Sequence, residues 1–315
     1  MDKNTTEYQY LFGPVPSRRL GLSLGVDLLP YKTCTLDCVY CESGQTTELT
    51  LERKPYIPVQ SVIDELSSYL STAPELDFIT FSGSGEPTLH SGIGKIIDFI
   101  RTCYPEYKIA LLTNSTLFNR EDVRNDVSGV DLVVASVDAV SDQVFSKINR
   151  PDSKLSMPEI IEGLSLFREI FKNELWVEVF IVPGVNDEDF ELDLVNSALK
   201  RIKPDKIQVN SLDRPGTEDW VEPVDNECLG KLIQRLTAAE IINKAEIEKV
   251  ASELSTDIKQ RITELVKRRP CTIDDISLSL GITVDKVGRN LKKLVEAGLV
   301  VEEKMERGVF FKLKN

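Results

Sequence analysis

The sequence has a single histidine, His90, and no run of apolar residues near the about 18 that a membrane-spanning helix needs. Its first 19 residues lack the apolar core of a secretory signal peptide. Repeats, low-complexity tracts and lipidation signals are also missing. We therefore expect a cytoplasmic protein with no membrane partner, in a compartment that keeps thiols reduced.

The sequence also has no excess of positive charge: the net charge of its 315 residues is -13. That charge argues against a protein that coats nucleic acid with its whole surface. The charge is uneven: residues 256–315 hold thirteen Lys and Arg against nine Asp and Glu, a net of +4, and the remainder carries -17. A basic tail on an acidic body indicates separate functions for two parts of the chain.

Between about residues 21 and 210, short apolar runs alternate with amphipathic helical patterns. Strands buried on both faces are expected at 22–28, 77–83, 108–114, 132–138, 176–182 and 206–212. Helices are expected at 59–71, 92–104, 157–171 and 189–202. Repeated strand–helix–strand units predict a parallel α/β sheet, either open or curved into a complete or partial barrel.

The last sixty residues follow a different pattern. Helices are expected at 256–269, 273–281 and 284–298, with Thr272 and Thr283 as N-caps, and two short strands follow. Three helices and a hairpin describe a winged helix-turn-helix. We therefore predict three parts: a core at 1–220, a helical linker at 221–255 and a winged helix-turn-helix domain at 256–315.

Three of the six cysteines, Cys34, Cys38 and Cys41, lie within eight residues at C-x3-C-x2-C spacing. A zinc site needs four ligands, and the only histidine that could supply the fourth is His90, far along the chain. Thioredoxin-type chemistry uses an isolated C-x2-C and leaves the third cysteine without a role. A [4Fe–4S] cluster fits better, since three cysteines would leave one iron open to a ligand. The other cysteines are scattered, and we expect them to be packing residues.

With Tyr40 directly before its last cysteine, this motif resembles that of the radical S-adenosylmethionine (SAM) enzymes, and the resemblance covers about residues 13–214. It implies a [4Fe–4S] cluster on the three cysteines, SAM as cofactor, and an external one-electron reductant of flavodoxin or ferredoxin type. It also implies cleavage of SAM to a 5′-deoxyadenosyl radical that abstracts hydrogen from a substrate. For the fold, we predict a partial (β/α)6 TIM-like barrel followed by the winged helix-turn-helix.

The segment SGEP at 84–87 is similar to the Gly-Gly-Glu-Pro motif of these enzymes, with serine in place of the first glycine. Polar residues at the ends of the following strands would converge on the same mouth, unless they only cap the strands. The resemblance implies a SAM site at these positions: Tyr40, Ser84, Gly85, Glu86, Thr113, Asn114, Ser115, Ser136, Asp138 and Val182.

Further polar residues are candidates to face the substrate, although each arginine could equally form a surface ion pair. They are Arg18, Arg19, Asn149, Arg150, Asn210 and Arg214. Arginine suits anionic groups. The layout resembles the radical SAM subgroup related to the tRNA wybutosine-synthesis enzymes, but it lacks their insertions and adds a winged helix. RNA, a polypeptide and an anionic metabolite remain alternative substrates.

The expected helix at 284–298 places Lys286, Arg289 and Lys293 on one face. That face suits contact with nucleic acid, although winged helices also bind polypeptides and the face could simply be solvated. An alternative function is therefore an iron–sulfur regulator that senses redox state or SAM and binds DNA. The SAM motifs favour the enzyme, because a sensor needs only the cysteines.

Overall fold

The computed structural model describes residues 8–17, 19–224, 226–236, 239–241, 258–268, 270–280, 282–305 and 308–314. An eight-stranded sheet in the order β1-β2-β5-β6-β7-β8-β9-β10 organises the larger part of the chain. Its strands are β1 (Leu11–Ser17), β2 (Gly21–Val26), β5 (Phe78–Phe81), β6 (Lys108–Thr113), β7 (Leu132–Ser136), β8 (Glu174–Ile181), β9 (Lys206–Ser211) and β10 (Ala239–Ile241). All neighbours pair in parallel except β1, which runs antiparallel to β2.

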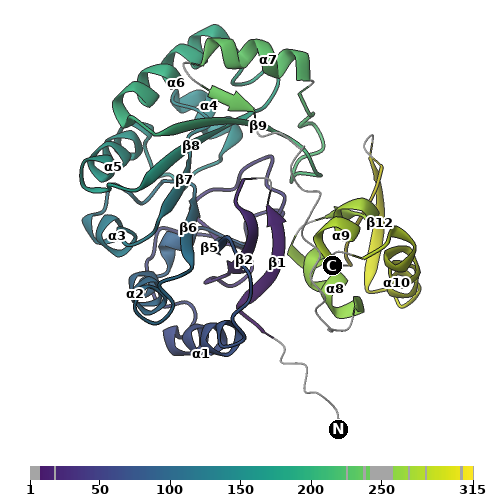
Figure 1. The fold of residues 1–315 in the computed structure, drawn as a ribbon. Helices are drawn as coiled ribbons and strands as arrows, with labels where there is room; N and C mark the ends of the chain where they lie inside the picture. Colours follow the sequence, from purple (N-terminus) through teal and green to yellow (C-terminus); the bar gives the residue numbers. More distant parts are fainter. Residues whose placement is uncertain are drawn as a thin grey trace.

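Helices cover the outer face of this curved sheet, where α1, α2, α3, α5 and α6 follow one another along its length (Figure 1). The helices of this part are α1 (Val59–Leu70), α2 (Ile93–Cys103), α3 (Glu121–Asp126), α4 (Asp142–Ile148), α5 (Met157–Ile170), α6 (Asp189–Ile202) and α7 (Asn226–Arg235). A short helical turn spans Pro87–Leu89, and a separate pair is formed by β3 (Thr33–Cys34) and β4 (Glu48–Leu49).

Apolar side chains fill both sides of the sheet. The outer side packs against the helices in one large core that includes Phe81, Phe167 and Val177. The inner side holds a smaller cluster that includes Leu20, Leu132 and Val134. Burial on both faces explains why the strands are nearly continuous apolar runs. The predicted parallel α/β architecture of the partial-barrel kind is confirmed.

Several elements differ from the expectation. Strand β1 was not expected. It holds Pro14 and Pro16, which have no N–H to donate, and an edge strand tolerates them because it pairs on one side only. The expected linker, 221–255, contains α7 and β10, and β10 extends the sheet beside β9. Part of that segment therefore packs with the core. No helix in the described ranges is long and apolar enough to span a membrane.

The C-terminal part contains α8 (Ile258–Arg268), β11 (Cys271–Thr272), α9 (Ile273–Leu280), α10 (Val284–Glu296), β12 (Val300–Met305) and β13 (Gly308–Leu313). The hydroxyl of Thr272 accepts from Asp275 N at 3.1 Å, and Asp275 Oδ2 accepts from Thr272 N at 3.0 Å, so the expected cap is a capping box. The three helices enclose a core of their own. This module lies beside β1 through α9 (Figure 1).

Candidate iron–sulfur and SAM site

The three clustered cysteines lie in one loop at the carboxyl ends of the strands. Cys34 ends β3, and tight turns follow, in which Cys41 N donates to Cys38 O and Gly44 N donates to Cys41 O, both at 3.1 Å. All three cysteines are free thiols and partly buried. Local backbone turns therefore hold three cysteine side chains within one segment of eight residues.

A side-chain N–H group from a different segment reaches each of the three sulfur atoms. Lys32 Nζ lies 2.8 Å from Cys41 Sγ, Asn114 Nδ2 lies 3.5 Å from Cys34 Sγ, and Asn149 Nδ2 lies 3.4 Å from Cys38 Sγ. Such donors stabilise negative charge on sulfur and are the usual partners of cluster ligands. Each of the three sulfur atoms thus has an N–H group close enough to stabilise a negative charge on it.

The three clustered thiols are ligands of the kind that an iron–sulfur cluster uses. Burial raises the pKa of Cys34 to about 11, against the opposing effect of Lys32, and burial also raises the pKa of Cys38. Buried thiols of this kind become thiolates when they bind a metal. Within the described residues, no three His, Cys, Asp or Glu side chains are arranged to share one metal ion. A [4Fe–4S] cluster takes each thiolate on a separate iron.

The SGEP segment packs against the cysteine loop. A Cβ on Gly85 would lie 1.8 Å from the carbonyl oxygen of Thr33, so only glycine allows this approach. Ser84, which stands where the family has glycine, donates from its N and Oγ to Asp27 Oδ2 at 3.1 and 2.9 Å. The turn after β5 is therefore fixed to both the cysteine loop and the end of β2.

The carboxylate of Glu86 is buried and joins two strand ends. It accepts from Thr88 N at 3.1 Å and Oγ1 at 2.6 Å, from Thr113 Oγ1 at 2.7 Å, and from Asn114 N at 2.7 Å. Burial raises the pKa of Glu86, and these donors oppose the shift. In this arrangement Glu86 positions the end of β6, and its contact with SAM stays a prediction.

The residues after β6 connect that strand to β7. Asn114 donates to Thr35 Oγ1 at 2.8 Å in the cysteine loop. Ser115 is fully buried, has a left-handed φ of 70°, and donates to Ser136 O at 3.0 Å. A non-glycine residue in this conformation is held there by its surroundings, as is common at binding sites. Three adjacent strand ends are thereby fixed around the cysteine loop.

Asp138 is the centre of a buried network on the other side of the loop. Its carboxylate accepts from Tyr40 Oη, from Asn149 Nδ2 at 2.8 Å and from Phe180 N at 2.9 Å. The Tyr40 ring stacks on Phe180 with centroids 3.8 Å apart. Burial raises the pKa of Asp138 to about 6, although these donors lower it. Val182, a further predicted SAM position, is buried beside this network.

The sequence region that carries this site matches a known family. Residues 28–194 match the radical SAM superfamily. The chain belongs to the radical SAM superfamily. The family implies a [4Fe–4S] cluster and SAM, which agrees with the thiol environment described above. Residues 256–301 match a second family, described as "Bacterial regulatory protein, arsR family", which supports the helix-turn-helix at the C-terminus.

Two curated relatives match most of the chain. A Brachyspira hyodysenteriae protein named GTPase Obg is 33% identical over 304 residues, which are 96% of this chain and 45% of that protein. This chain thus spans less than half of that relative. The UPF0026 protein MJ1312 of Methanocaldococcus jannaschii is 32% identical over 315 residues, covering 96% of this chain and 95% of that protein.

Among solved structures, the fold is similar to that of TYW1 with a lysine–pyruvate adduct bound. The TM-score is 0.52, the identity is 16%, and the match covers 71% of this chain and 75% of that chain. At this identity the similarity shows the fold alone. It agrees with the predicted resemblance to the wybutosine-synthesis subgroup at the level of architecture.

A segment after β9 lies on the cysteine loop of this radical SAM protein; we name residues 214–221 the strap. Thr217 Oγ1 donates to Cys41 O at 3.2 Å, and Glu218 N donates to Val39 O at 3.0 Å. The Arg214 side chain, 10% exposed, lies 3.7 Å from Glu42 and 3.4 Å from Asp275 of α9. The strap therefore touches both the cysteine loop and the winged helix module.

The residues predicted to face the substrate occupy different environments. Arg19 forms an ion pair with Glu178, whose position on β8 is in register with Ser136. Arg150 pairs with Glu218 of the strap at 2.6 Å. Asn149 is buried at Cys38, Asn210 is half-buried at the end of β9, and Arg214 has the contacts described above; Arg18 lies outside the described residues. Their contact with a substrate stays a prediction.

Lys32 and Glu178 are among the residues at the site that the sequence did not single out. Lys32 stands two positions before Cys34, and its proximity to the cysteines in sequence could have drawn attention to it. Glu178 alternates with apolar residues in β8, and a charged residue within a buried strand is a signal of an inward-facing polar group.

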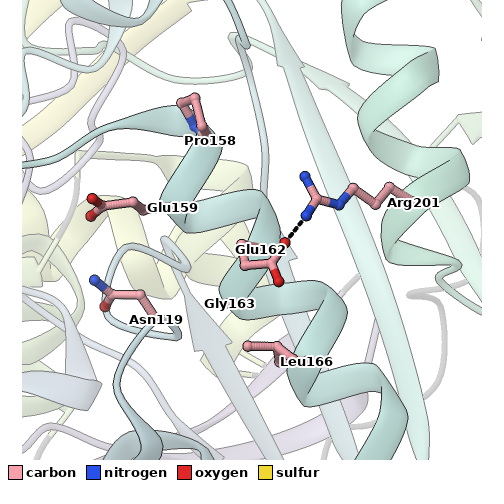
Figure 2. A pocket seen from close by; sticks show the side chains of 7 residues that line it. All are labelled: Asn119, Pro158, Glu159, Glu162, Gly163, Leu166 and Arg201. Atoms are coloured by element: carbon pink, nitrogen blue, oxygen red, sulfur yellow. Dashed lines mark ion pairs between the residues drawn. The ribbon is translucent and has the colours of Figure 1, made fainter.

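The structure also has a pocket that lies apart from the candidate site. Figure 2 shows it along α5, between the loop residue Asn119 and Arg201 of α6, with the ion pair of Arg201 and Glu162 across it. None of the predicted cluster, SAM or substrate residues lines this pocket.

Proposed function

We propose that the protein is a radical SAM enzyme that holds a [4Fe–4S] cluster through Cys34, Cys38 and Cys41 and binds SAM beside it. The observation that carries the proposal is that each of the three sulfurs has its own N–H donor, at the end of a parallel sheet whose strand ends are tied together. When bound, the cluster and SAM supply a one-electron cleavage that yields a 5′-deoxyadenosyl radical. The electron comes from a flavodoxin- or ferredoxin-type donor.

The chain's own residues position these groups and exclude water. Lys32, Asn114 and Asn149 hold the sulfur atoms by hydrogen bonds, and Glu86 and Asp138 fix the strand ends that face them. The proposed SAM site follows those ends and comprises Tyr40, Ser84, Gly85, Glu86, Thr113, Asn114, Ser115, Ser136, Asp138 and Val182. Because hydrogen abstraction uses a reactive radical, a rigid and water-poor mouth suits this chemistry.

We place the substrate against the inner side of the sheet, next to the Arg19–Glu178 ion pair. This pair has side-chain exposures of 21% and 14% and lies near the apolar inner cluster. An ion pair in such a place can exchange partners with a charged group of a ligand. An anionic group on RNA, on a polypeptide or on a metabolite meets this requirement. The residues proposed to face it remain Arg18, Arg19, Asn149, Arg150, Asn210 and Arg214.

The test is made under anaerobic conditions on protein reconstituted with iron and sulfide. We expect about four irons per chain, and formation of 5′-deoxyadenosine from SAM when dithionite is added. Cys38→Ala should lose both, whereas the matched control Cys103→Ala, at an exposed cysteine, should keep both. A reconstituted cluster without SAM cleavage would favour the alternative, an iron–sulfur regulator.

A second proposed activity is nucleic-acid binding by the winged helix module. Lys286, Arg289, Lys292 and Lys293 of α10 are all exposed, and this region matches a regulatory protein family. Basic side chains on such a helix contact phosphates. We expect Arg289→Ala with Lys293→Ala to weaken binding to duplex DNA or tRNA, measured by fluorescence anisotropy at two salt concentrations. Equal affinity of the variant would leave a polypeptide as the partner. The domain boundaries at 220 and 256 are part of this proposal.

A further inference from the structure

Lys32 is a lysine whose charged end is inside the protein. Only 3% of the residue is exposed, and its ammonium group donates to Cys41 Sγ at 2.8 Å and to Gly44 O at 2.8 Å. Neither acceptor is a carboxylate. Lysine is almost never fully buried unless its charge has a partner. The sulfur of Cys41 is therefore the natural partner of this charge.

The backbone of Lys32 is held as firmly as its side chain. Lys32 N donates to Thr47 Oγ1 at 2.9 Å, and Lys32 O accepts from Thr47 N at 3.0 Å and Glu48 N at 3.1 Å. The hydrogen bond to Gly44 O fixes the far end of the side chain. The position of the positive charge is thus set by contacts on both sides, and it does not depend on a flexible surface rotamer.

The other N–H donors to the sulfur atoms are neutral. Asn114 approaches Cys34 and Asn149 approaches Cys38, at 3.5 and 3.4 Å. Among the described side chains that donate to the sulfurs of Cys34, Cys38 and Cys41, Lys32 alone carries a full charge. A neutral amide would satisfy a sulfur acceptor, so a buried ammonium adds an electrostatic effect that hydrogen bonding alone does not require.

We propose that Lys32 sets the reduction potential of the iron–sulfur cluster by placing a positive charge against the Cys41 ligand. This inference rests on the proposed function, in which Cys41 is a cluster ligand. Reduction transfers one electron from an external one-electron donor to the cluster and makes it more negative by one charge, with no bond formed or broken. A positive charge a few ångströms away stabilises the reduced form more than the oxidised form. Lys32 therefore makes the cluster easier to reduce.

Lys32 is a positioning residue here, because its charge acts on the cluster through the sulfur of Cys41 and touches no substrate. The structure separates this role from packing. Methionine has a side chain of similar length and would fill the same space without the charge, and arginine would keep the charge with a different shape. Comparison of the two variants thus distinguishes charge from volume.

The experiment is a redox titration of reconstituted wild-type protein, Lys32→Met, Lys32→Arg and the control Lys95→Met, followed by electron paramagnetic resonance. Lys95 is an exposed lysine on α2. At a fixed potential, we expect the ratio of reduced to oxidised cluster to fall about tenfold in Lys32→Met, which corresponds to a shift of about 59 mV for one electron. Lys32→Arg should retain most of the wild-type potential, and Lys95→Met should not change it.

An unchanged potential in a Lys32→Met protein with wild-type iron content would overturn the proposal. If Lys32→Met holds no iron, Lys32→Gln is titrated in its place, and the same fall is expected. Loss of iron from both neutral variants while both remain folded by circular dichroism would also overturn it, because Lys32 would then serve cluster assembly. A wild-type protein that binds no cluster would instead refute the proposed function.

Discussion

Gly85 packs against the backbone of Thr33 so closely that a Cβ on Gly85 would lie 1.8 Å from the Thr33 carbonyl oxygen. Glu86 N donates to the same oxygen at 3.2 Å. The contact joins the turn after β5 to the residue before Cys34. The position of the cysteine loop on the strand ends therefore depends on the absence of a side chain at position 85.

We expect Gly85→Ala to destabilise the protein by several kcal/mol, because a backbone atom rather than a flexible side chain occupies the space. Gly230→Ala is the matched control, because Gly230 lies in helix α7 and a Cβ there would meet nothing within 4 Å. This substitution should be neutral or stabilise the protein by about 0.5–1 kcal/mol. Urea denaturation measures both. Equal stability of Gly85→Ala and wild type would show that the loop and the turn do not pack as described.

The buried Asp138 predicts a pH dependence of stability. Its folded pKa of about 6 is above the ordinary 3.8, so the folded state binds the proton more tightly than the unfolded state. The contribution of protonated Asp138 to the free energy of unfolding is therefore complete below about pH 4 and is lost as the pH rises through about 6. Between pH 5 and pH 7.5, iron-free protein should lose about 1 kcal/mol of unfolding free energy through this group.

Urea denaturation of wild type and Asp138→Asn at the two pH values tests this expectation. The variant is less stable overall, because its amide carries N–H groups among the donors Tyr40, Asn149 and Phe180. The difference between wild type and variant should nevertheless shrink as the pH rises. The exposed Asp98→Asn serves as the control, and a difference that stays constant with pH would contradict the assignment.

Removal of the metal should leave cysteines of very different reactivity. In iron-free protein, the pKa of about 11 at Cys34 leaves about 0.1% thiolate at pH 8, and its burial limits access. We expect iodoacetamide to label the exposed Cys103 at least about a hundredfold faster than Cys34, as followed by mass spectrometry. Cys103→Ser should remove the fast reaction. Equally rapid labelling of Cys34 would mean that the loop opens without the cluster.

The strap predicts an energetic link between the core and the winged helix module. Arg214 and Asp275 lie 3.4 Å apart with side-chain exposures of 10% and 20%. A double-mutant cycle with Arg214→Met and Asp275→Asn should give a coupling of about 1 kcal/mol. The more exposed pair of Lys54 and Glu52 should give a smaller value in the same experiment. A coupling of zero at Arg214 would mean that the module does not dock in solution.

The fold was predictable where local pattern decides it. Six parallel strands are short apolar runs because both faces of the sheet are buried, and all six were predicted. β1 was missed because Pro14 and Pro16 argue against a strand unless its place at the sheet edge is known. β10 has three residues and no pattern of its own, and it is a strand because β9 offers it a partner.

The candidate site, like the fold, was predictable only where a local sequence pattern decides it. The spacing of the cysteines and the polar strand ends indicated where the site lies, because both are read from neighbouring residues. The long-range contacts around the cysteine loop were not predictable, since Asn149 and Cys38 are 111 positions apart and Thr217 and Cys41 are 176 apart. Contacts of this kind follow from the folded topology, and no local pattern encodes them.

The strap also has a consequence for how the protein matures in the cell. Cys34, Cys38 and Cys41 leave the ribosome early, but Asn114, Asn149 and the strap that surround them follow much later in synthesis. Chains fold from the N-terminus as they are made. A nascent chain therefore lacks the contacts around the three cysteines until about residue 221 has emerged, so the proposed cluster would gain its complete surroundings only after that point.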